Sequence, residues 1–391
     1  MACAAEAALT DDAELQSIGI RRWKFQKALC DAAAAAGIVI KFSKRTELVE
    51  PRGDGSGYVD VRFADGTART ARLVIGADGV KSQVREAVVG KLSAEFTGVT
   101  CLMGAAKVPR PVRGISFPSS RTTKNHGCFY PTGDDEQIFQ LYFPAKTLEE
   151  AWGTLSAEEG AKECHALADK LEADGWDQVF LAPLRSAESV IRTALCSREP
   201  LHKWAAASGR IVLLGDAAHP PVPYIGQGAQ MAMEDCGVLA QLLRHHCCGG
   251  GTAPFAPTAD NLARATDAYQ AMRIPRTHRI LGASHTLGKT QQRRAESWWY
   301  NLARELEIKL QVALHGTLPI MKPGAAYDYA EDVKRFIAQD GAEPSADAEP
   351  KGETTHSTYG LKLTPRASVA AAAAVAVAAA ATALLVVARR R

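Results

Sequence analysis

The densest chemical signal in the sequence is a glycine-rich stretch that follows an apolar run. Residues 211–214 have the composition of a buried strand, Gly215 ends that strand, and Asp216 comes next. Ligands of open α/β sheets bind at the carboxyl ends of the strands, where a carboxylate can accept hydrogen bonds from the hydroxyls of a polyol chain. Gly226 and Gly228 allow the backbone to approach a flat ligand closely, and the following helix offers unpaired N–H groups to an electron-rich oxygen. We therefore predict a ligand site here rather than a loop that needs glycines only to turn.

Two further segments carry residues of matching chemistry. Residues 76–85 read Gly-Ala-Asp-Gly-Val-Lys-Ser-Gln-Val-Arg, which predicts a strand, a turn at Asp78 and a helix capped by Ser82. Arg22 opens an earlier helix, and a guanidinium suits bidentate recognition of phosphate. Arg21 is adjacent, so the register is uncertain by one residue, and an arginine that only faces solvent is the alternative.

Other candidate residues have structural interpretations. His219 follows the end of the predicted strand, and we expect a structural role rather than a proton relay. A later helix carries Arg273 and Arg276, and we expect it to act as a scaffold whose arginines form salt bridges at the surface. The run His-His-Cys-Cys at 245–248 has metal-ligand residue types. Zinc sites usually space their ligands along the chain, so we interpret this run as a helix end that enters a loop.

Together these segments resemble the FAD-dependent aromatic hydroxylases, the class A flavoprotein monooxygenases that include salicylate-hydroxylase-like and zeaxanthin-epoxidase-like members. The resemblance covers about residues 18–290. It implies an FAD cofactor, NAD(P)H and O₂ as co-substrates, and transfer of one oxygen atom to a small aromatic or polyene substrate. It names no catalytic side chain and no metal, because the cofactor carries the chemistry. The cofactor-binding residues that it implies are Arg22, Asp78, Asp216, Pro223, Gly226, Gly228 and Ala229.

The glycine motif with which that family opens is missing from the sequence. A strand followed by Gly-x-Gly-x-x-Gly lets a helix N-terminus hold the FAD pyrophosphate, whereas the glycines within residues 53–57 lie between two expected strands. We therefore expect an N-terminally truncated FAD-binding domain, with weak FAD binding if the cellular protein begins at Met1. An incomplete gene model, a non-catalytic truncated paralogue and an FAD-linked oxidoreductase without oxygen insertion are the alternatives.

The order of elements predicts an α/β fold, a glutathione-reductase-like Rossmann domain with an inserted antiparallel β-sheet substrate domain. The expected helices cover 22–37 and 230–245, and the expected strands cover 38–40 (buried), 58–63, 72–75, 100–108, 127–131 and 137–143, the last two as a hairpin. The expected domains are a partial FAD-binding domain at 1–95, the sheet domain at 96–200, the return of the FAD-binding domain at 201–290, C-terminal helices at 291–340, a linker at 341–366 and a tail at 367–388.

The composition excludes several classes of protein. With 47% hydrophobic and 23% charged residues, the chain is neither disordered nor a polytopic membrane protein. Its 46 basic and 43 acidic residues give a net charge of +3 without a basic stripe, so we expect no nucleic-acid partner. Nine cysteines without a C-x-x-C pair favour reduced thiols in a compartment that faces the cytosol.

The C-terminal tail is apolar. Residues 367–388 carry no charge and consist mostly of alanine and valine. As a helix they would reach about 33 Å, enough to cross a hydrocarbon core of about 30 Å. We therefore expect a C-terminal transmembrane tail anchor, a catalytic domain that faces the cytosol, and a lipophilic substrate. The alternatives are an alanine-rich soluble helix or a low-complexity tail, since alanine contributes little apolar surface.

Overall fold

A computed structural model describes residues 19–293 and 327–340, together with 306 and 310. Short gaps interrupt the first range at 110–111, 113, 121–122, 134, 154, 250–253 and 256. The chain divides into two compact units, residues 1–338 and 339–391. The elements described below belong to the first unit, apart from the last two residues of its final helix.

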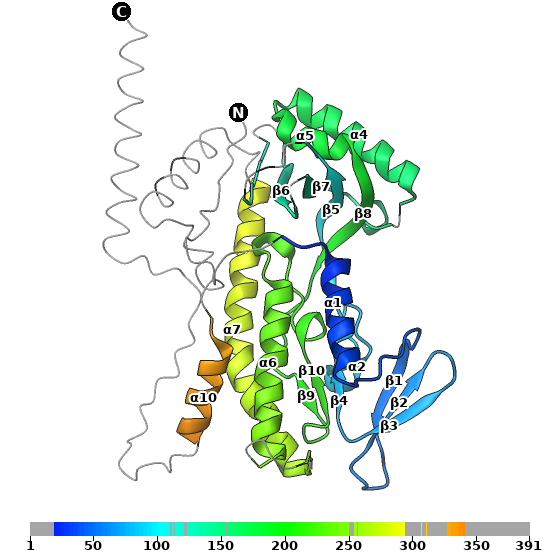
Figure 1. Ribbon diagram of the computed structural model, residues 1–391, viewed down its shortest axis with the longest axis vertical. Helices are drawn as coiled ribbons and strands as arrows, with labels where there is room; N and C mark the ends of the chain where they lie inside the picture. Colours follow the sequence, from blue (N-terminus) through cyan, green and yellow to red (C-terminus); the bar gives the residue numbers. More distant parts are fainter. Residues whose placement is uncertain are drawn as a thin grey trace, which may run out of the picture. The chain divides into compact units, whose positions relative to one another are not determined.

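A small sheet with two parallel strands is the centre of the α/β part (Figure 1). β4 (Val74–Gly76) runs parallel to β10 (Ile211–Leu213), whose other edge pairs antiparallel with β9 (Ala205–Ala206). All three residues of β10 are buried, as expected for a strand that is covered on both faces. The helices of this part are α2 (Val84–Val89), α6 (Gly228–Cys247), α7 (Ala259–Arg293) and α10 (Tyr329–Asp340).

One hydrophobic core joins this sheet to its helices. It includes the fully buried side chains of Trp204 and Tyr269, and α6 contributes Val238, Leu239 and Leu242. A separate antiparallel sheet consists of β1 (Thr46–Pro51), β2 (Val59–Phe63) and β3 (Ala68–Ala71), in that order. The predicted strand over 58–63 and the predicted helix over 230–245 are therefore confirmed.

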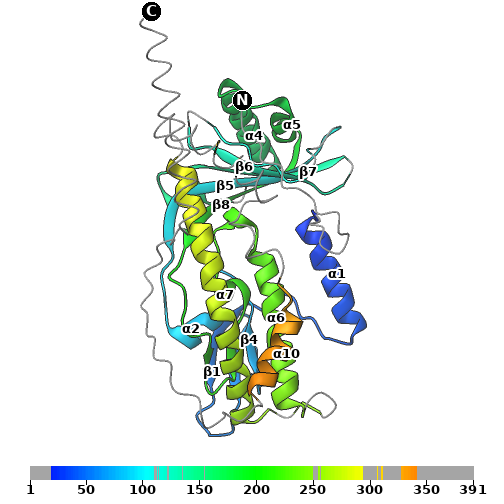
Figure 2. The ribbon, with the colours of Figure 1, turned by 90° about the vertical axis from the view of Figure 1, so that its left-hand side faces the viewer.

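The segment between the two parts of the α/β layer forms a four-stranded antiparallel sheet, the inserted sheet, with helices on one face (Figure 2). Its strand order is β6 (His126–Pro131), β7 (Glu136–Pro144), β5 (Glu95–Lys107) and β8 (Ala187–Ser197). The predicted hairpin is the β6–β7 pair. α4 (Ala157–Ala173) and α5 (Gln178–Arg185) cover one face and share a core with Leu102, Phe129, Phe139 and Leu141, and the short helix α3 (Leu148–Ala151) contacts β5 and β8.

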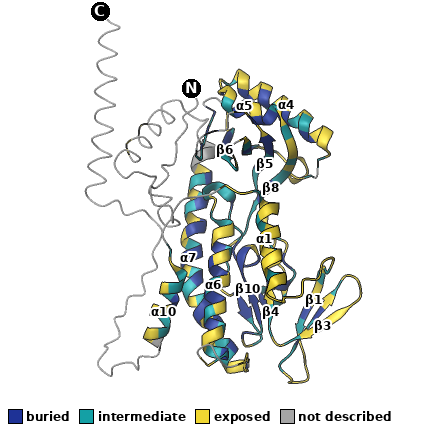
Figure 3. Cartoon of the chain, viewed as in Figure 1, coloured by how far each residue is buried: buried dark blue, intermediate teal, exposed yellow. Residues whose placement is uncertain are grey.

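The prediction of a buried strand over 38–40 is wrong. Ile38, Val39 and Ile40 follow α1 (Arg22–Ala35) without forming a strand, and they are 60%, 78% and 40% exposed. α1 itself buries none of its 14 residues, as its largely exposed surface in Figure 3 shows. A strand needs a hydrogen-bonded neighbour, and within the described ranges β4 pairs only with β10, so its other edge carries no strand.

The fold class also needs a correction at the C-terminus. The chain has the expected FAD-binding type of α/β fold with antiparallel sheets. The expected transmembrane helix is not supported, because none of the helices within the described residues is long and apolar enough to span a bilayer. Residues 367–388, on which that prediction rested, lie outside the described residues.

Gly104 of β5 is a test of how closely the inserted sheet is packed. A Cβ there would lie 2.5 Å from Cζ of Phe139 and 2.6 Å from the carbonyl oxygen of Ser189. We expect Gly104→Ala to lower the free energy of unfolding by about 2 kcal/mol, because overpacking displaces its neighbours. Urea unfolding measures this, with Gly133→Ala as the control, since a Cβ on Gly133 meets nothing nearer than 4.0 Å. Equal stability of the two variants would contradict the packing shown here.

Candidate functional site

β10 brings Asp216 to the edge of the sheet at which the strand ends. Leu213 is the last strand residue, and Gly215–Ala217 form the 3₁₀ turn η2. The Asp216 side chain is exposed, whereas Gly215 and Ala217 are buried. Nearby protein still removes part of its hydration, which raises the pKa of Asp216, while His219 and Arg22 act in the opposite direction. Asp216 is therefore a carboxylate on a fixed turn.

The start of α6 lies beside this carboxylate. A Cβ on Gly228 would be 4.0 Å from Oδ1 of Asp216, so the glycine keeps the space between them open. The hydrogen bond from Met231 N to Gln227 O, 2.9 Å long, leaves the amides of residues 228–230 without an intrahelical acceptor. Oε1 of Gln227 is buried and has no hydrogen-bond partner among the described residues. Donors and an acceptor are thus available next to Asp216.

A hydrogen bond from α7 holds the loop between Asp216 and α6. Pro223–Ile225 form the 3₁₀ turn η3, and Gly226 ends it in the left-handed conformation with φ of +64°. The Ser284 hydroxyl of α7 donates to the carbonyl oxygen of Val222 at 2.6 Å, and both residues are buried. Ala229, the second residue of α6, is exposed. The structure therefore brings the predicted residues Asp216, Pro223, Gly226, Gly228 and Ala229 into one continuous turn–helix segment.

Aromatic rings connect this loop to the inserted sheet. The Tyr224 ring centroid is 5.6 Å from that of His126 and 5.5 Å from that of Tyr142, and His126 stacks on Tyr142 at 5.0 Å. The Tyr142 hydroxyl donates to Oε1 of Gln140 at 2.7 Å. Strand register places these side chains on the sheet face opposite α4 and α5. We call this the open face; its residues on β5, β6 and β7 include Cys101, Met103, His126, Cys128, Gln140 and Tyr142.

The structure distinguishes the two adjacent arginines at the start of α1. Arg21 forms ion pairs with Glu136 at 2.7 Å and Glu188 at 3.3 Å, so it ties the helix to the inserted sheet. Arg22 is exposed, and the described part of the chain offers it no hydrogen bond or ion pair. Its charge nevertheless acts on Asp216. Of the two arginines left open by the sequence, Arg21 is engaged by Glu136 and Glu188, so Arg22 is the one that stays available for a ligand.

The second glycine segment reaches the site through Arg85. Asp78 accepts from the amides of Gln83 at 2.8 Å and Val84 at 3.2 Å, and so caps the start of α2. Arg85 is 4% exposed and donates to the carbonyl oxygens of Val80 at 2.6 Å and Ala217 at 3.0 Å. Burial lowers the pKa of Arg85, and the neighbouring charge of Arg198 adds to that effect. Asp78 therefore organises α2, and Arg85 holds the turn that carries Asp216.

The arginines of α7 form salt bridges, as expected, but the prediction that these lie at the surface is wrong. Arg273 is fully buried and pairs with Asp235 at 2.7 Å and Glu234 at 2.8 Å. Arg276 is 8% exposed and pairs with Glu234 at 2.7 Å. Buried ions need partners at short range, and here two arginines meet two carboxylates. The helix is a scaffold, as expected, but through an internal ion-pair cluster.

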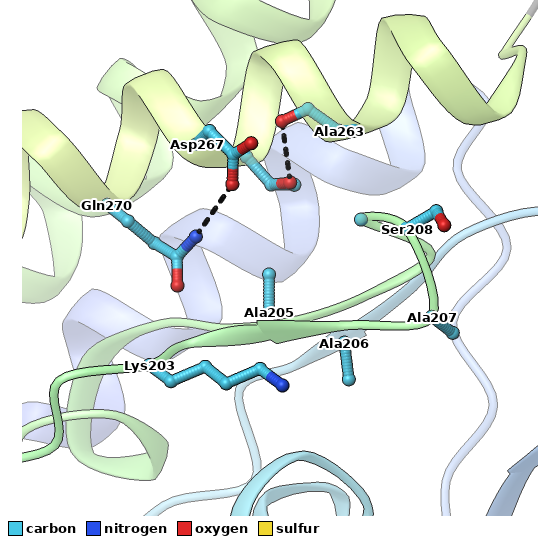
Figure 4. Close-up of a pocket in the computed structure, with 10 residues that line it drawn as sticks. Lys203, Ala205, Ala206, Ala207, Ser208, Ala263, Asp267 and Gln270 are labelled. Atoms are coloured by element: carbon cyan, nitrogen blue, oxygen red, sulfur yellow. Dashed lines mark hydrogen bonds between the residues drawn. The ribbon is translucent and has the colours of Figure 1, made fainter.

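These residues fit part of an FAD molecule. Asp216, the free amides at the start of α6 and the unpaired Gln227 acceptor suit the ribityl chain and the ring system. Among the described residues, no glycine-rich turn of the kind that holds a pyrophosphate follows a strand of the parallel sheet. A pocket of about 340 Å³ between the β9–β10 turn and α7 (Figure 4) lies at the opposite end of β10 and does not belong to this site. The described residues therefore contain the part of the expected site that would face the ribityl chain and the ring system.

Several site residues have no sequence motif of their own. The roles of Gln227, Arg85 and Tyr224 depend on contacts made only in the folded chain. The pair His126–Tyr142 had a usable signal, because the predicted hairpin brings these two positions opposite each other. The predicted helix end at 245–248 is confirmed, since α6 ends at Cys247.

The comparisons with known proteins agree with this geometry. The model of the FAD binding domain family matches residues 5–266, and the chain belongs to that family. It is 31% identical over 249 residues to the 6-hydroxynicotinate 3-monooxygenase of Bordetella bronchiseptica, which covers 62% of this chain and 61% of the relative. It is also 31% identical over 270 residues to 3-hydroxybenzoate 6-hydroxylase 2 of Aquipseudomonas alcaligenes, covering 67% of this chain and 75% of the relative.

The solved structures agree on the fold. The crystal structure of Klebsiella pneumoniae HpxO complexed with FAD and uric acid has a TM-score of 0.61 at 21% identity, and covers 78% of this chain and 72% of that one. The predicted resemblance to aromatic-hydroxylase-type flavoproteins is confirmed. The chain spans about three fifths of the length of the Bordetella relative.

The pair of Arg21 and Glu136 makes a pH-dependent contribution that can be measured. The hydrogen bond from Arg21 lowers the pKa of Glu136 to about 2, from an ordinary value of 4.5. A carboxyl with a lowered pKa stabilises the fold above its unfolded value, and that stabilisation is lost as the pH falls through the folded value. We expect Glu136→Gln to destabilise by about 1 kcal/mol at pH 7, and the difference from wild type to shrink as the pH falls from 4.5 toward 2.

Urea unfolding at several pH values measures that difference. Asp31→Asn is the matched control, because its partner Lys27 lies on the same helix and both side chains are largely exposed. A Glu136→Gln effect that stayed constant from pH 7 to pH 3 would show that the ion pair is not its source.

Proposed function

We propose that this chain is an FAD-dependent monooxygenase that uses NAD(P)H and O₂ to hydroxylate a small aromatic substrate. One observation carries the proposal: the exposed Asp216 carboxylate, the free amides at the start of α6 and the ring-lined open face meet in one place. Membership of the FAD-binding family supports the cofactor. The names of the relatives, which act on hydroxylated aromatic rings, support the substrate class.

Each part of the site has a task that its chemistry suits. Asp216 accepts hydrogen bonds from the ribityl hydroxyls, because an ionised carboxylate only accepts. The amides of Gly228 and Ala229 donate to an electron-rich oxygen of the ring system at the positive end of α6. Arg22 supplies a positive charge whose field reaches Asp216. When bound, FAD supplies the electron transfer from NAD(P)H and the activation of O₂.

The open face of the inserted sheet covers the proposed substrate site. His126 and Tyr142 are 6% and 3% exposed, and Tyr224 contacts both from the loop next to Pro223. Of these three rings, that of Tyr224 is partly exposed, so a planar aromatic substrate would contact the cluster by offset stacking on Tyr224. Water kept away from this face strengthens the polar contacts inside the site and limits side reactions. These side chains therefore orient the substrate and keep water away from it, and none of them is assigned a proton-transfer step.

The decisive experiment combines flavin binding with isotope incorporation. The full chain is titrated with FAD, then supplied with NADPH or NADH, ¹⁸O₂ and a panel of hydroxylated benzoates, pyridines and phenols. We expect bound flavin, NAD(P)H oxidation that depends on the aromatic compound, and a product that carries one ¹⁸O atom.

Two results would contradict the proposal. Absence of flavin binding would exclude it at its first step. Bound flavin with NAD(P)H oxidation but no labelled product from any compound would favour an FAD-linked oxidoreductase that does not insert oxygen.

Asp216 can be tested without a known substrate. Its side chain has no hydrogen-bond partner in the described part of the fold, so Asp216→Ala should leave the unfolding free energy within about 0.5 kcal/mol of wild type. We expect the same variant to weaken FAD binding by about tenfold or more, because hydrogen bonds to a charged group contribute about 1.5–3 kcal/mol. Fluorescence titration with FAD measures the dissociation constant. Asp260→Asn, an exposed acid in the first turn of α7, is the control, and equal FAD affinity of both variants would remove Asp216 from the site.

A further inference from the structure

A buried carboxylate, Asp235 of α6, lies directly behind the turn that carries Asp216. It is 0% exposed and accepts three hydrogen bonds. Oδ2 accepts from the Gly215 amide at 2.9 Å and from Nε2 of His219 at 2.5 Å, and Oδ1 accepts from Nε of Arg273 at 2.7 Å. Because a carboxylate only accepts, Nε2 of His219 carries the hydrogen. The three donors come from the turn itself, from His219 two residues beyond the turn, and from α7.

These contacts determine the direction in which Asp216 points. Gly215 has a left-handed φ of +58°, and a Cβ there would lie 3.1 Å from Cβ of Ala232. Its amide is held by Asp235, and its carbonyl oxygen accepts from the amides of Ala218 and His219 at 2.9 Å each. Both sides of the Gly215 residue are therefore bound, which fixes the backbone from which the Asp216 side chain leaves.

His219 is fixed with the same precision. Its side chain is 1% exposed, and its ring lies 5.0 Å from that of Trp204, whose side chain is fully buried. Burial alone would raise the pKa of Asp235, but the hydrogen bond and charge of His219, the charge of Arg273 and the Gly215 amide outweigh it, and the pKa is lowered. Asp235 therefore stays ionised and keeps all three donors.

The neighbouring acid Glu234 belongs to the same cluster but faces away from the turn. It pairs with Arg273 at 2.8 Å and with Arg276 through two contacts of 2.8 and 2.7 Å. None of these partners belongs to the turn that carries Asp216. The chain thus offers two adjacent buried acids that share Arg273, and only one of them contacts the site.

We propose that Asp235 is a positioning residue for the flavin site. Asp235 holds Gly215 and His219 so that the Asp216 side chain points at the ligand. This inference rests on the proposed function, because the ligand is the flavin. Asp235 contacts no ligand itself and acts only through the turn. Glu234, by contrast, stabilises the packing of α6 on α7 without directing Asp216.

The test compares Asp235→Asn with Glu234→Gln in the full chain. Each change removes one buried negative charge from the same cluster and keeps the size of the side chain. We expect both variants to lower the melting temperature by similar amounts. Only Asp235→Asn should raise the FAD dissociation constant, by about tenfold or more, and change the visible circular dichroism of the bound flavin. Glu234→Gln should stay within about threefold of wild type with an unchanged spectrum.

A second pair of variants, at His219, tests the positioning role of Asp235 if Asp235→Asn does not fold. His219→Phe keeps a ring against Trp204 but removes the donor to Asp235, whereas His219→Gln keeps an N–H donor at a similar reach. We expect weaker FAD binding and an altered flavin spectrum for the phenylalanine variant, and near wild-type behaviour for the glutamine variant.

The outcomes separate this inference from the proposed function. A wild-type chain that does not bind FAD would overturn both. Wild-type binding with equal affinity and equal spectra for Asp235→Asn and Glu234→Gln would overturn the positioning role and leave the proposed function intact. Equal spectra for His219→Phe and wild type would do the same.

Discussion

The parallel pairing of β4 with β10 determines where the candidate site lies, because it brings the ends of two distant segments to one edge. The register pairs Val74 with Ile211 and Gly76 with Leu213. A Cβ on Gly76 would lie 2.7 Å from Cβ of Val84, so α2 can approach the strand only over a glycine. That approach places Arg85 against the carbonyl oxygen of Ala217. The turn after β10 is thus held by a residue more than a hundred positions earlier in the chain.

Charge burial explains why the same turn is rigid on its other side. Asp235 and Glu234 together carry two negative charges, and Arg273 and Arg276 carry two positive charges, so these four charges cancel. Removal of one partner from such a cluster leaves an uncompensated buried charge, which destabilises by about 3–5 kcal/mol. The cluster therefore fixes the distance between α6 and α7. Asp216, outside it, remains free to bind a ligand.

The sequence predicted those parts of the fold that depend on local pattern. The helix over 230–245, the β6–β7 hairpin and the strand before Asp216 all have a clear period or a turn signal, and the structure contains them. α4 was not predicted although Ser156 and Glu159 form a capping box at its start, because the face that it buries consists mainly of small residues, Gly160, Cys164 and Ala168. Residues 38–40 failed for a different reason. Their composition favours a strand, but strand formation depends on a neighbour, which no local pattern contains.

For the candidate site too, the sequence predicted what depends on local residues and missed what depends on contacts between distant parts of the chain. Asp216 and the glycines were recognisable because their chemistry is local, whereas the buried state of Arg273 depends on partners from another helix. The helix that carries Arg22 is held by long-range contacts of this kind. α1 buries no residue, and its start is tied to the sheet by the pairs of Arg21 with Glu136 and Glu188. Partly exposed pairs of this kind contribute about 1 kcal/mol or less. A buried cluster holds the turn of Asp216, so we expect α1 to detach from the inserted sheet at a lower free energy than that turn unfolds.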